Sequence, residues 1–330
     1  MAATSHWLSV RVHAVRAEAL DVQSFDLRAP DGGALPAFTA GSHVDVEVST
    51  ATGPLLRQYS LCNDPAERHR YVIGVGRDAA SRGGSVALHD QLRAGAILRI
   101  GAPRNNFALD EAAPHSVLVA GGIGITPMLA MARRLALLGR PWTLYHCVRS
   151  PCRAAFAEEL QALAPPGGPG RVVTVVDGLP GAVRLDLAAL VREASHGAHF
   201  YCCGPVPMLE AFGRATAGVG DARVHVEWFS APAPAATADA PAGSFSVQLK
   251  RKNRRFDIPA DQSILQVLLD GGIDVDHSCR EGLCGTCETR VLAGMPDHRD
   301  PILAGRKDPP QDRMLVCVSR CAGPELVLDL

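Results

Sequence analysis

Four cysteines near the carboxyl end of the chain have the clearest chemistry. Three stand at the spacing C-x4-C-x2-C within the segment 278–287, and the fourth follows after 29 intervening residues. This spacing is typical of a [2Fe–2S] cluster bound by four thiolates. Gly282 and Gly285 allow the tight turn that brings three sulfurs to one small cluster. The predicted ligands are Cys279, Cys284, Cys287 and Cys317.

Two other uses of these cysteines fit the spacing less well. A zinc site more often shows two separated C-x2-C pairs, or Cys and His pairs at short spacing, and it is the main alternative. A disulfide framework needs an exported chain. Cys321, four residues after the last predicted ligand, is interpreted as a bystander in the following turn.

Length and composition limit what the rest of the chain can be. At 330 residues the chain exceeds what one hydrophobic core usually supports, so two or three domains are expected. A formal net charge of −1 argues against nucleic acid as a partner. No run of about 18 apolar residues is present, so no membrane partner is expected. Ten cysteines without an export signal predict a cytoplasmic protein.

The first two domains differ in the period of their apolar residues. Residues 1–109 contain short alternating strands, such as 43–48, divided by turn residues, which predicts an antiparallel β-barrel. Residues 110–230 alternate strands with helices, which predicts an α/β doubly wound parallel sheet. Within it, a buried strand at 115–120 leads into a helix, for which we expect Thr126 as the N-cap and Pro127 at the first helical position.

The remaining chain predicts a linker and a third domain. Residues 231–243 consist mostly of Ala and Pro and predict a semi-extended linker. Residues 244–330 open with a hairpin around the basic tip 250–255. A short helix, the cysteine loop, a return strand at 314–318 and a final strand at 325–330 follow. This segment resembles a plant-type ferredoxin domain of α+β fold from end to end.

Two motifs in the first domain are candidates for a flavin site. Arg57-Gln-Tyr-Ser60 lies at a strand end and contains a cation for a phosphate, a flat ring and a hydrogen-bonding hydroxyl. Arg82-Gly-Gly-Ser85 is a glycine turn opening a helix, whose free N–H groups suit a phosphate. Each motif alone is weak evidence for a flavin site. The first, for example, could be a solvated strand edge.

Two further motifs lie in the second domain. Gly121-Gly-Ile-Gly124 joins a buried strand to a helix, which is where a dinucleotide pyrophosphate rests. Cys203-Gly-Pro205 ends a later strand and opens another helix. The predicted nucleotide contacts here are Gly121, Gly122, Gly124, Thr126, Cys203, Gly204 and Pro205.

Together these motifs resemble one known family over residues 8 to 330. The chain is similar to the phthalate dioxygenase reductase family, which includes the reductases of vanillate demethylase-type Rieske oxygenases. The order of flavin, nicotinamide and ferredoxin domains also matches. The matching pieces are Arg57-Gln-Tyr-Ser60, Arg82-Gly-Gly-Ser85, Pro103-Arg-Asn-Asn-Phe107, Gly121-Gly-Ile-Gly-Ile-Thr-Pro127, Cys203-Gly-Pro205, His225-Val-Glu-Trp-Phe229 and the cysteine loop.

The resemblance implies which residues contact each cofactor. It implies FMN rather than FAD, places Cys203 beside the nicotinamide, and makes Ser60, Cys203 and Phe229 the candidate catalytic residues. Family members often carry Lys where this chain has Gly76, beside Arg77. The residues implied around the flavin are Arg57, Tyr59, Ser60, Arg82, Gly83, Gly84, Ser85, Asn105, Phe107 and Phe229.

The choice between NADH and NADPH depends on the segment after the second strand of the α/β domain. Arg149 and Ser150, with Arg153 nearby, could bind a 2′-phosphate, yet related NADH enzymes carry a similar pair. We predict NADH.

The predicted function is the reductase component of a Rieske oxygenase system. NADH reduces FMN, and the [2Fe–2S] cluster delivers single electrons to a separate Rieske non-haem iron oxygenase. The alternative is a stand-alone NAD(P)H-dependent flavin and iron–sulfur reductase with a small-molecule acceptor. A pure electron carrier is disfavoured by the nicotinamide and flavin motifs. The basic tip 250–255 is a candidate docking element, although a solvated turn is the simpler interpretation.

Overall fold

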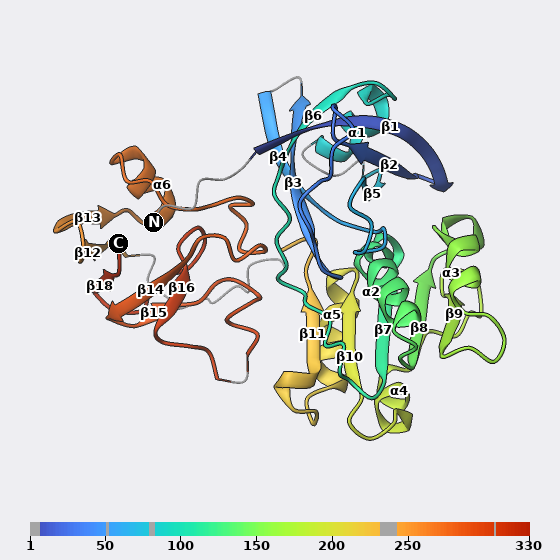
Figure 1. The fold of residues 1–330 in the computed structure, drawn as a ribbon. Coiled ribbons are helices and arrows are strands. Elements are labelled where there is room, and N and C mark those ends of the chain that lie inside the picture. Colours follow the sequence, from blue (N-terminus) through green and yellow to red (C-terminus); the bar gives the residue numbers. More distant parts are fainter. Residues whose placement is uncertain (1–6, 51–52, 79–82, 232–242, 307) are drawn as a thin grey trace. The chain divides into compact units, whose positions relative to one another are not determined.

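The computed structural model describes residues 7–50, 53–78, 83–231, 243–306 and 308–330. The chain divides into two compact units, with the boundary between Phe229 and Ser230. The larger unit holds the first two predicted domains, coloured blue to yellow in Figure 1, and the smaller unit holds the cysteine loop. Among the described residues, no helix is long and apolar enough to cross a membrane. The predicted linker lies almost entirely outside the described residues.

The first sheet is an antiparallel barrel, as predicted. Its order is β4-β3-β6-β1-β2-β5, and a bridge between Leu61 and Ile73 joins its two edges. Alternate side chains such as Val10, Phe25 and Val46 fill the interior, because successive residues of a strand face opposite sides. The elements are β1 (Trp7–Ala19), β2 (Val22–Arg28), β3 (His43–Thr50), β4 (Gly53–Ser60), β5 (Tyr71–Gly76), α1 (Gly84–Gln91) and β6 (Ile97–Gly101).

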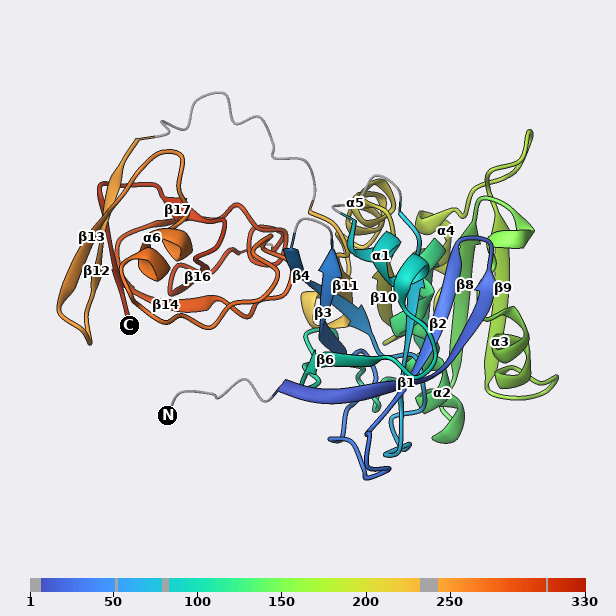
Figure 2. The ribbon, with the colours of Figure 1, turned by 90° about the horizontal axis from the view of Figure 1, so that it is seen from above.

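The second sheet is parallel and doubly wound, also as predicted. Its order is β11-β10-β7-β8-β9. Figure 2 shows α2 and α3 on one side of the sheet and α4 and α5 on the other. The elements are β7 (Ser116–Gly121), η1 (Gly122–Gly124), α2 (Ile125–Leu137), β8 (Trp142–Val148), η2 (Pro151–Arg153), α3 (Ala157–Leu163), β9 (Gly170–Val176), α4 (Leu187–Glu193), β10 (His199–Cys203), α5 (Val206–Ala215), η3 (Asp221–Arg223) and β11 (Val224–Glu227).

The prediction for the start of α2 was wrong. Strand β7 extends to Gly121, and the 3-10 turn η1 runs directly into the helix, so the N-cap is Gly124. The Thr126 hydroxyl therefore lies inside the first turn, where it donates to the carbonyl of Ile123 at 3.0 Å. Thr126 is buried, and its methyl group faces the barrel.

The barrel and the parallel sheet share one hydrophobic core. Barrel residues Val22, Ala40 and Cys62 pack with Met128 and Leu129 of α2. A glycine permits this close approach: a Cβ atom at Gly74 would lie 2.6 Å from the methyl carbon of Thr126. The larger unit therefore fixes β4 and β5 relative to the ends of the parallel strands, which positions the candidate site.

The described residues of the smaller unit form a five-stranded sheet of order β13-β12-β18-β14-β16, a two-stranded sheet β15-β17, and one helix. Ser263 caps this helix, its hydroxyl accepting a hydrogen bond from the N–H of Gln266 at 3.1 Å. The return strand predicted at 314–318 is shorter than expected and ends before Cys317. The elements are β12 (Phe245–Leu249), β13 (Arg254–Ile258), α6 (Ile264–Asp270), β14 (Glu288–Ala293), β15 (Pro296–Asp297), β16 (Arg313–Leu315), β17 (Arg320–Cys321) and β18 (Glu325–Leu328).

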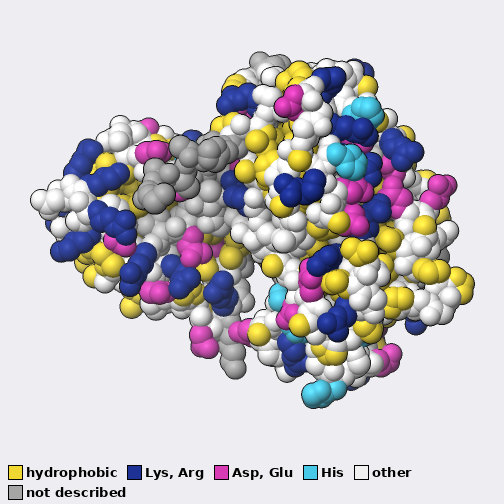
Figure 3. All heavy atoms as spheres, in the orientation of Figure 1, with side chains coloured by type: hydrophobic (Ala, Val, Ile, Leu, Met, Phe, Trp, Pro, Cys, Tyr) yellow, Lys and Arg dark blue, Asp and Glu magenta, His cyan; other side chains and the backbone are white. Residues whose placement is uncertain are grey.

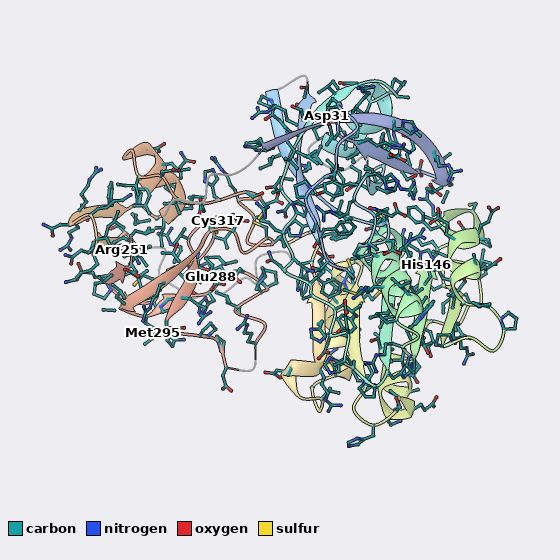
Figure 4. All side chains as sticks on the ribbon, in the orientation of Figure 1. Asp31, His146, Arg251, Glu288, Met295 and Cys317 are labelled. Carbon is teal, nitrogen blue, oxygen red and sulfur yellow. The ribbon has the colours of Figure 1, made fainter. Side chains whose placement is uncertain are left out.

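The basic hairpin tip is engaged within its own unit. Arg251 pairs with Asp329 at 2.7 Å, and Arg255 lies 3.3 Å from Glu325. Figure 4 shows Arg251 on the opposite side of this unit from Cys317. A partner bound at the tip would therefore lie far from the cluster ligands. On the face shown in Figure 3, positive and negative side chains are interspersed, so no surface of one charge is visible there.

Candidate functional site

The two glycine motifs of the larger unit meet at the carboxyl ends of β7 and β10. The chain winds outward from β7 through β8 to β9, then returns to the other side of β7 with β10 and β11. The ends of β7 and β10 therefore form the topological switch point, which is where open α/β sheets bind their ligands.

Glycine is required where these two turns touch. A Cβ atom at Gly124 would lie 2.1 Å from the carbonyl oxygen of Cys203, and one at Gly121 would lie 2.6 Å from Cδ of Pro205. One at Gly204 would lie 3.1 Å from Cα of Gly121. Gly122 has a φ of 54°, a conformation that favours glycine. The turns form one continuous backbone surface at the start of α2, whose positive end suits a pyrophosphate.

His146 of β8 contacts the backbone of the glycine turn. Its Nε2 lies 3.2 Å from the carbonyl oxygen of Gly122, and its side chain is labelled in Figure 4 beside α2. Burial lowers the pKa of His146 to about 4, although the contact with Gly122 opposes this shift. The imidazole is therefore neutral and donates this hydrogen bond. The sequence prediction did not include His146, because a buried strand histidine has no motif of its own.

Ser60, Cys203 and Glu227 converge where the barrel meets the parallel sheet. Ser60 ends β4, while Cys203 and Glu227 are register partners at the ends of β10 and β11. Cys203 faces the core shared with the barrel, and its neighbour Cys202 faces the opposite core. Burial raises the pKa of the Cys203 thiol, and the Glu227 carboxylate adds to that shift, so Cys203 is a neutral thiol.

Glu227 has the most perturbed carboxyl group of the larger unit. Burial raises the pKa of Glu227 to about 8, while the Ser60 hydroxyl lowers it. The Ser60 hydroxyl oxygen and Glu227 Oε2 are both buried, and among the described residues neither has a partner of normal hydrogen-bond geometry. Buried polar atoms of this kind are expected where a bound molecule supplies the missing partner. Glu227 was absent from the sequence prediction, although an acid at the end of an alternating strand was a usable signal.

Phe229 follows β11 and remains 40% exposed. Other large aromatic side chains of this unit, such as Phe212 and Tyr201, are fully buried. An exposed flat ring two residues beyond Glu227 can stack on a planar ligand.

Arg57 lies against the start of helix α1. A Cβ atom at Gly84 would lie 2.9 Å from Cγ of Arg57, so a larger residue here would displace the Arg57 side chain. The preceding Gly83 has a φ of 92°, which glycine adopts without strain. A guanidinium beside the N-terminus of an eight-residue helix provides both the charge and the N–H groups that a phosphate requires. Arg82 lies outside the described residues.

The other residues predicted near the flavin phosphate and ring differ in what they contact. Tyr59 is partly buried, and burial raises its pKa while the charge of Arg57 lowers it, so Tyr59 and Arg57 lie close together. The Ser85 hydroxyl accepts a hydrogen bond from the N–H of Asp78 at 3.2 Å. Arg77, beside Gly76, forms an ion pair with Asp90 of α1.

Asn105 and Phe107 pack at the contact between the barrel and the sheet. The Asn105 amide donates to the Thr39 hydroxyl at 2.7 Å and to the Ala40 carbonyl at 2.9 Å. Phe107 is buried, with its ring edge against Tyr201 at 5.9 Å between centroids. Both residues therefore have structural contacts of their own.

Arg149 and Ser150 follow β8, the strand next to the glycine strand. Arg149 is exposed, and the Ser150 hydroxyl lies 3.2 Å from the Cys152 sulfur. The nearby Arg153 forms an ion pair with Asp21 of the barrel at 3.0 Å.

The four predicted cluster ligands converge in the smaller unit. Their thiols lie close enough to perturb each other in pairs: Cys284 raises the pKa of Cys279, and Cys287 raises the pKa of Cys317. A [2Fe–2S] cluster needs this arrangement, because each iron takes two thiolates.

The loop also supplies donors and space for the cluster. The N–H groups of Glu281 and Leu283 lie 3.3 and 3.4 Å from the Cys279 sulfur, and such bonds to sulfur tune a cluster's potential. Gly282, with a φ of 74°, fits beneath the loop, where a Cβ atom would lie 2.8 Å from Cγ2 of Val318. Cys321 instead contacts its own turn, accepting from the N–H of Gly323 at 3.3 Å.

Two family models match separate parts of the chain. Residues 118–213 match the oxidoreductase NAD-binding domain, and residues 247–322 match the 2Fe-2S iron-sulfur cluster binding domain. The chain therefore has an NAD-binding domain and a [2Fe–2S] domain, in agreement with the glycine turns and the paired thiols.

Relatives match the chain from end to end. It is 50% identical to the phenoxybenzoate dioxygenase subunit beta of Ectopseudomonas oleovorans, covering 100% of this chain and 99% of that one. It is 45% identical to the tetrachlorobenzoquinone reductase of Sphingobium chlorophenolicum, covering 94% of each. The solved structure of phthalate dioxygenase reductase, titled a modular structure for electron transfer from pyridine nucleotides to [2Fe–2S], is 39% identical, with a TM-score of 0.70 and 98% of both chains covered. These matches, together with the switch-point site and the paired thiols, show that the chain is an oxidoreductase belonging to the phthalate dioxygenase reductase family.

Proposed function

We propose that this chain takes electrons from NADH through FMN and a [2Fe–2S] cluster, and delivers them to a separate Rieske non-haem iron oxygenase. The observation that carries the proposal is the convergence of Ser60, Cys203 and Glu227 at the switch point, in a chain that also pairs four cysteine thiols. Relatives named as subunits of dioxygenases support the oxygenase partner. A cytoplasmic location agrees with ten cysteines, none of which forms a disulfide in the described part of the chain.

Three modules divide this work in the proposal. Residues 1–109 bind FMN, residues 110–230 bind NADH, and residues 244–330 bind the cluster, with a linker at 231–243. The six-stranded sheet, the parallel five-stranded sheet and the five-stranded sheet of the smaller unit support this division. When bound, the flavin accepts a hydride and the cluster carries single electrons onward.

The chain's residues position the flavin in the first module. Arg57 and the N-terminus of α1 form a site for one phosphate, which favours FMN over a dinucleotide flavin. Tyr59 and Phe229 present flat rings, while the Ser60 hydroxyl offers a hydrogen bond to the polar edge of the flavin. The residues proposed to contact FMN are Arg57, Tyr59, Ser60, Arg82, Gly83, Gly84, Ser85, Asn105, Phe107 and Phe229.

The second module orients the nicotinamide. The backbone of the two glycine turns binds the pyrophosphate, and the buried Cys203 thiol excludes water from one face of the nicotinamide. Glu227 is protonated at neutral pH, so it adds no negative charge where electrons arrive. The residues proposed to contact NADH are Gly121, Gly122, Gly124, Thr126, Arg149, Ser150, Cys203, Gly204 and Pro205.

One experiment tests this proposal against its alternative. The purified protein is supplied with NADH and either a Rieske oxygenase with its substrate or a benzoquinone. Product formed in proportion to NADH consumed supports the oxygenase partner. The relative named tetrachlorobenzoquinone reductase makes a small-molecule acceptor the second candidate. Faster turnover with the quinone, and no product from any Rieske oxygenase, would favour that candidate.

A further inference from the structure

The turn between β1 and β2 of the barrel contacts the nucleotide-binding domain at one place. This turn contains Asp21, whose carboxylate Oδ2 lies 3.0 Å from Nη2 of Arg153. Both side chains are about two-fifths exposed, at 41% and 44%. They are 132 residues apart in the sequence. Asp21 belongs to the barrel, and Arg153 belongs to the domain with the parallel sheet.

The backbone holds Asp21 in this position. The N–H of Leu20 donates to the carbonyl of Cys152 at 2.8 Å, and the N–H of Arg77 donates to the carbonyl of Asp21 at 2.7 Å. Asp21 has a φ of 61°, a left-handed conformation that Asp and Asn adopt more readily than other non-glycine residues. The carboxylate is therefore fixed beside Arg153 by contacts on both sides of the turn.

Arg153 belongs to the segment that selects the nucleotide. It follows β8, the neighbour of the glycine strand β7. In doubly wound sheets an acid in this region binds the 2′-hydroxyl of the adenosine ribose, whereas an arginine accommodates a 2′-phosphate. In this chain, the residues that could bind a 2′-phosphate are Arg149, Ser150 and Arg153.

We propose that Asp21 selects NADH against NADPH by pairing with Arg153. A guanidinium paired with a carboxylate offers fewer donors to a 2′-phosphate, and the carboxylate also repels that dianion. The 2′-hydroxyl of NADH carries no charge, so its binding is not opposed. This proposal rests on the proposed use of NADH and names the residue that determines it.

The test uses the full holoprotein and the variant Asp21→Asn. Asparagine keeps the size of the side chain and tolerates the left-handed backbone, so the turn is retained. Affinities for 2′,5′-ADP and for ADP are measured by calorimetry, and kcat/KM is measured with NADPH and NADH. We expect the affinity for 2′,5′-ADP and kcat/KM for NADPH to rise about three- to fivefold, near the upper limit of what one exposed ion pair can supply. Values for ADP and NADH should remain within about twofold.

Two further variants make the result specific. Adding Arg153→Gln to Asp21→Asn should cancel the gain, because the released guanidinium is then absent. Glu47→Gln removes a comparable exposed ion pair with Arg99 elsewhere on the barrel and should change neither affinity. Unchanged 2′,5′-ADP affinity in Asp21→Asn, or a gain that persists without Arg153, would overturn the proposal. A wild-type preference for NADPH would instead refute the NADH step of the proposed function, and the selection with it.

Discussion

A Cβ atom added to Gly124 would lie 2.1 Å from the carbonyl oxygen of Cys203 and 2.5 Å from its carbonyl carbon. The two turns that define the nucleotide site are therefore in direct backbone contact, although they are far apart in the sequence. The geometry of the site depends on this contact as much as on any side chain.

Substitution Gly124→Ala should separate the two turns. Backbone atoms cannot rotate away as a side chain can, so overpacking should lower the stability of the folded chain by about 1–3 kcal/mol. Because the displaced turns would no longer hold the pyrophosphate, kcat/KM for NADH should also fall. Gly213→Ala is the matched control, because a Cβ atom there meets nothing within 4 Å. Cluster absorbance should be normal in both variants. An active Gly124→Ala enzyme would show that the turns need not touch.

The stability of the protein should fall with rising pH in a way that depends on Glu227. Burial raises the folded-state pKa of Glu227 from 4.5 to about 8, so between these values the unfolded chain releases a proton that the folded chain retains. The contribution of Glu227 to the free energy of unfolding is fully present below pH 4.5 and is lost as the pH rises through about 8. Urea denaturation of Glu227→Gln should show a shallower fall over this window, whereas the exposed Glu158→Gln should behave as the wild type. Identical slopes in all three proteins would contradict the assigned pKa.

The same group predicts a pH dependence of flavin reduction. Above about pH 8 the Glu227 carboxylate is ionised, and its negative charge beside the site opposes the arrival of a hydride. Reduction by NADH, followed by stopped-flow absorbance, should slow above that pH in the wild type. Glu227→Gln should keep the neutral-pH rate across the range. A wild-type profile that is flat to pH 9.5 would exclude this role.

Loss of the His146 side chain should weaken nucleotide binding. The neutral imidazole donates to the carbonyl of Gly122, and one such bond contributes about 1 kcal/mol. His146→Ala should therefore raise KM for NADH about fivefold, with a smaller change in kcat, while His146→Gln should recover part of the affinity. Equal losses in kcat and kcat/KM, with no recovery by glutamine, would mean that His146 acts on the reaction and not on the turn.

The pairing of the cluster thiols can be tested with two serine substitutions. Cys284→Ser removes one member of the Cys279 pair and should abolish the visible absorbance and EPR signal of the [2Fe–2S] cluster. NADH-dependent ferricyanide reduction through the flavin should persist. Cys321→Ser is the control, because Cys321 contacts its own turn, and its cluster signal should match the wild type. A full signal in Cys284→Ser would exclude the proposed ligand set.

The fold could be predicted largely from local patterns in the sequence. Alternation in 43–48 predicted β3, and the change to a helical period after residue 115 predicted the parallel sheet; both sheet types are confirmed. The prediction failed at the start of α2, because the capping pattern of Thr126 could not reveal that a 3-10 turn already joined β7 to the helix.

The candidate site was only partly predictable, because some of its members depend on contacts across the chain. The cysteines have a characteristic spacing, and the glycine turns lie between a strand and a helix, so the sequence alone predicts them as candidates. Glu227 is notable only because it lies beside Ser60 and Cys203, and His146 only because it reaches Gly122. Asp21 and Arg153 likewise meet only in the folded chain.

The central claim is that one chain passes electrons from a pyridine nucleotide through a flavin to a thiolate-bound two-iron cluster. The most direct measurement is low-temperature EPR of the oxygen-free holoprotein, frozen after addition of NADH, with the flavin absorbance recorded in parallel. The account predicts bleaching of the flavin together with the rhombic signal of a reduced [2Fe–2S] cluster. Bleaching without that signal, or a colourless protein that binds zinc at the four cysteines, would contradict it.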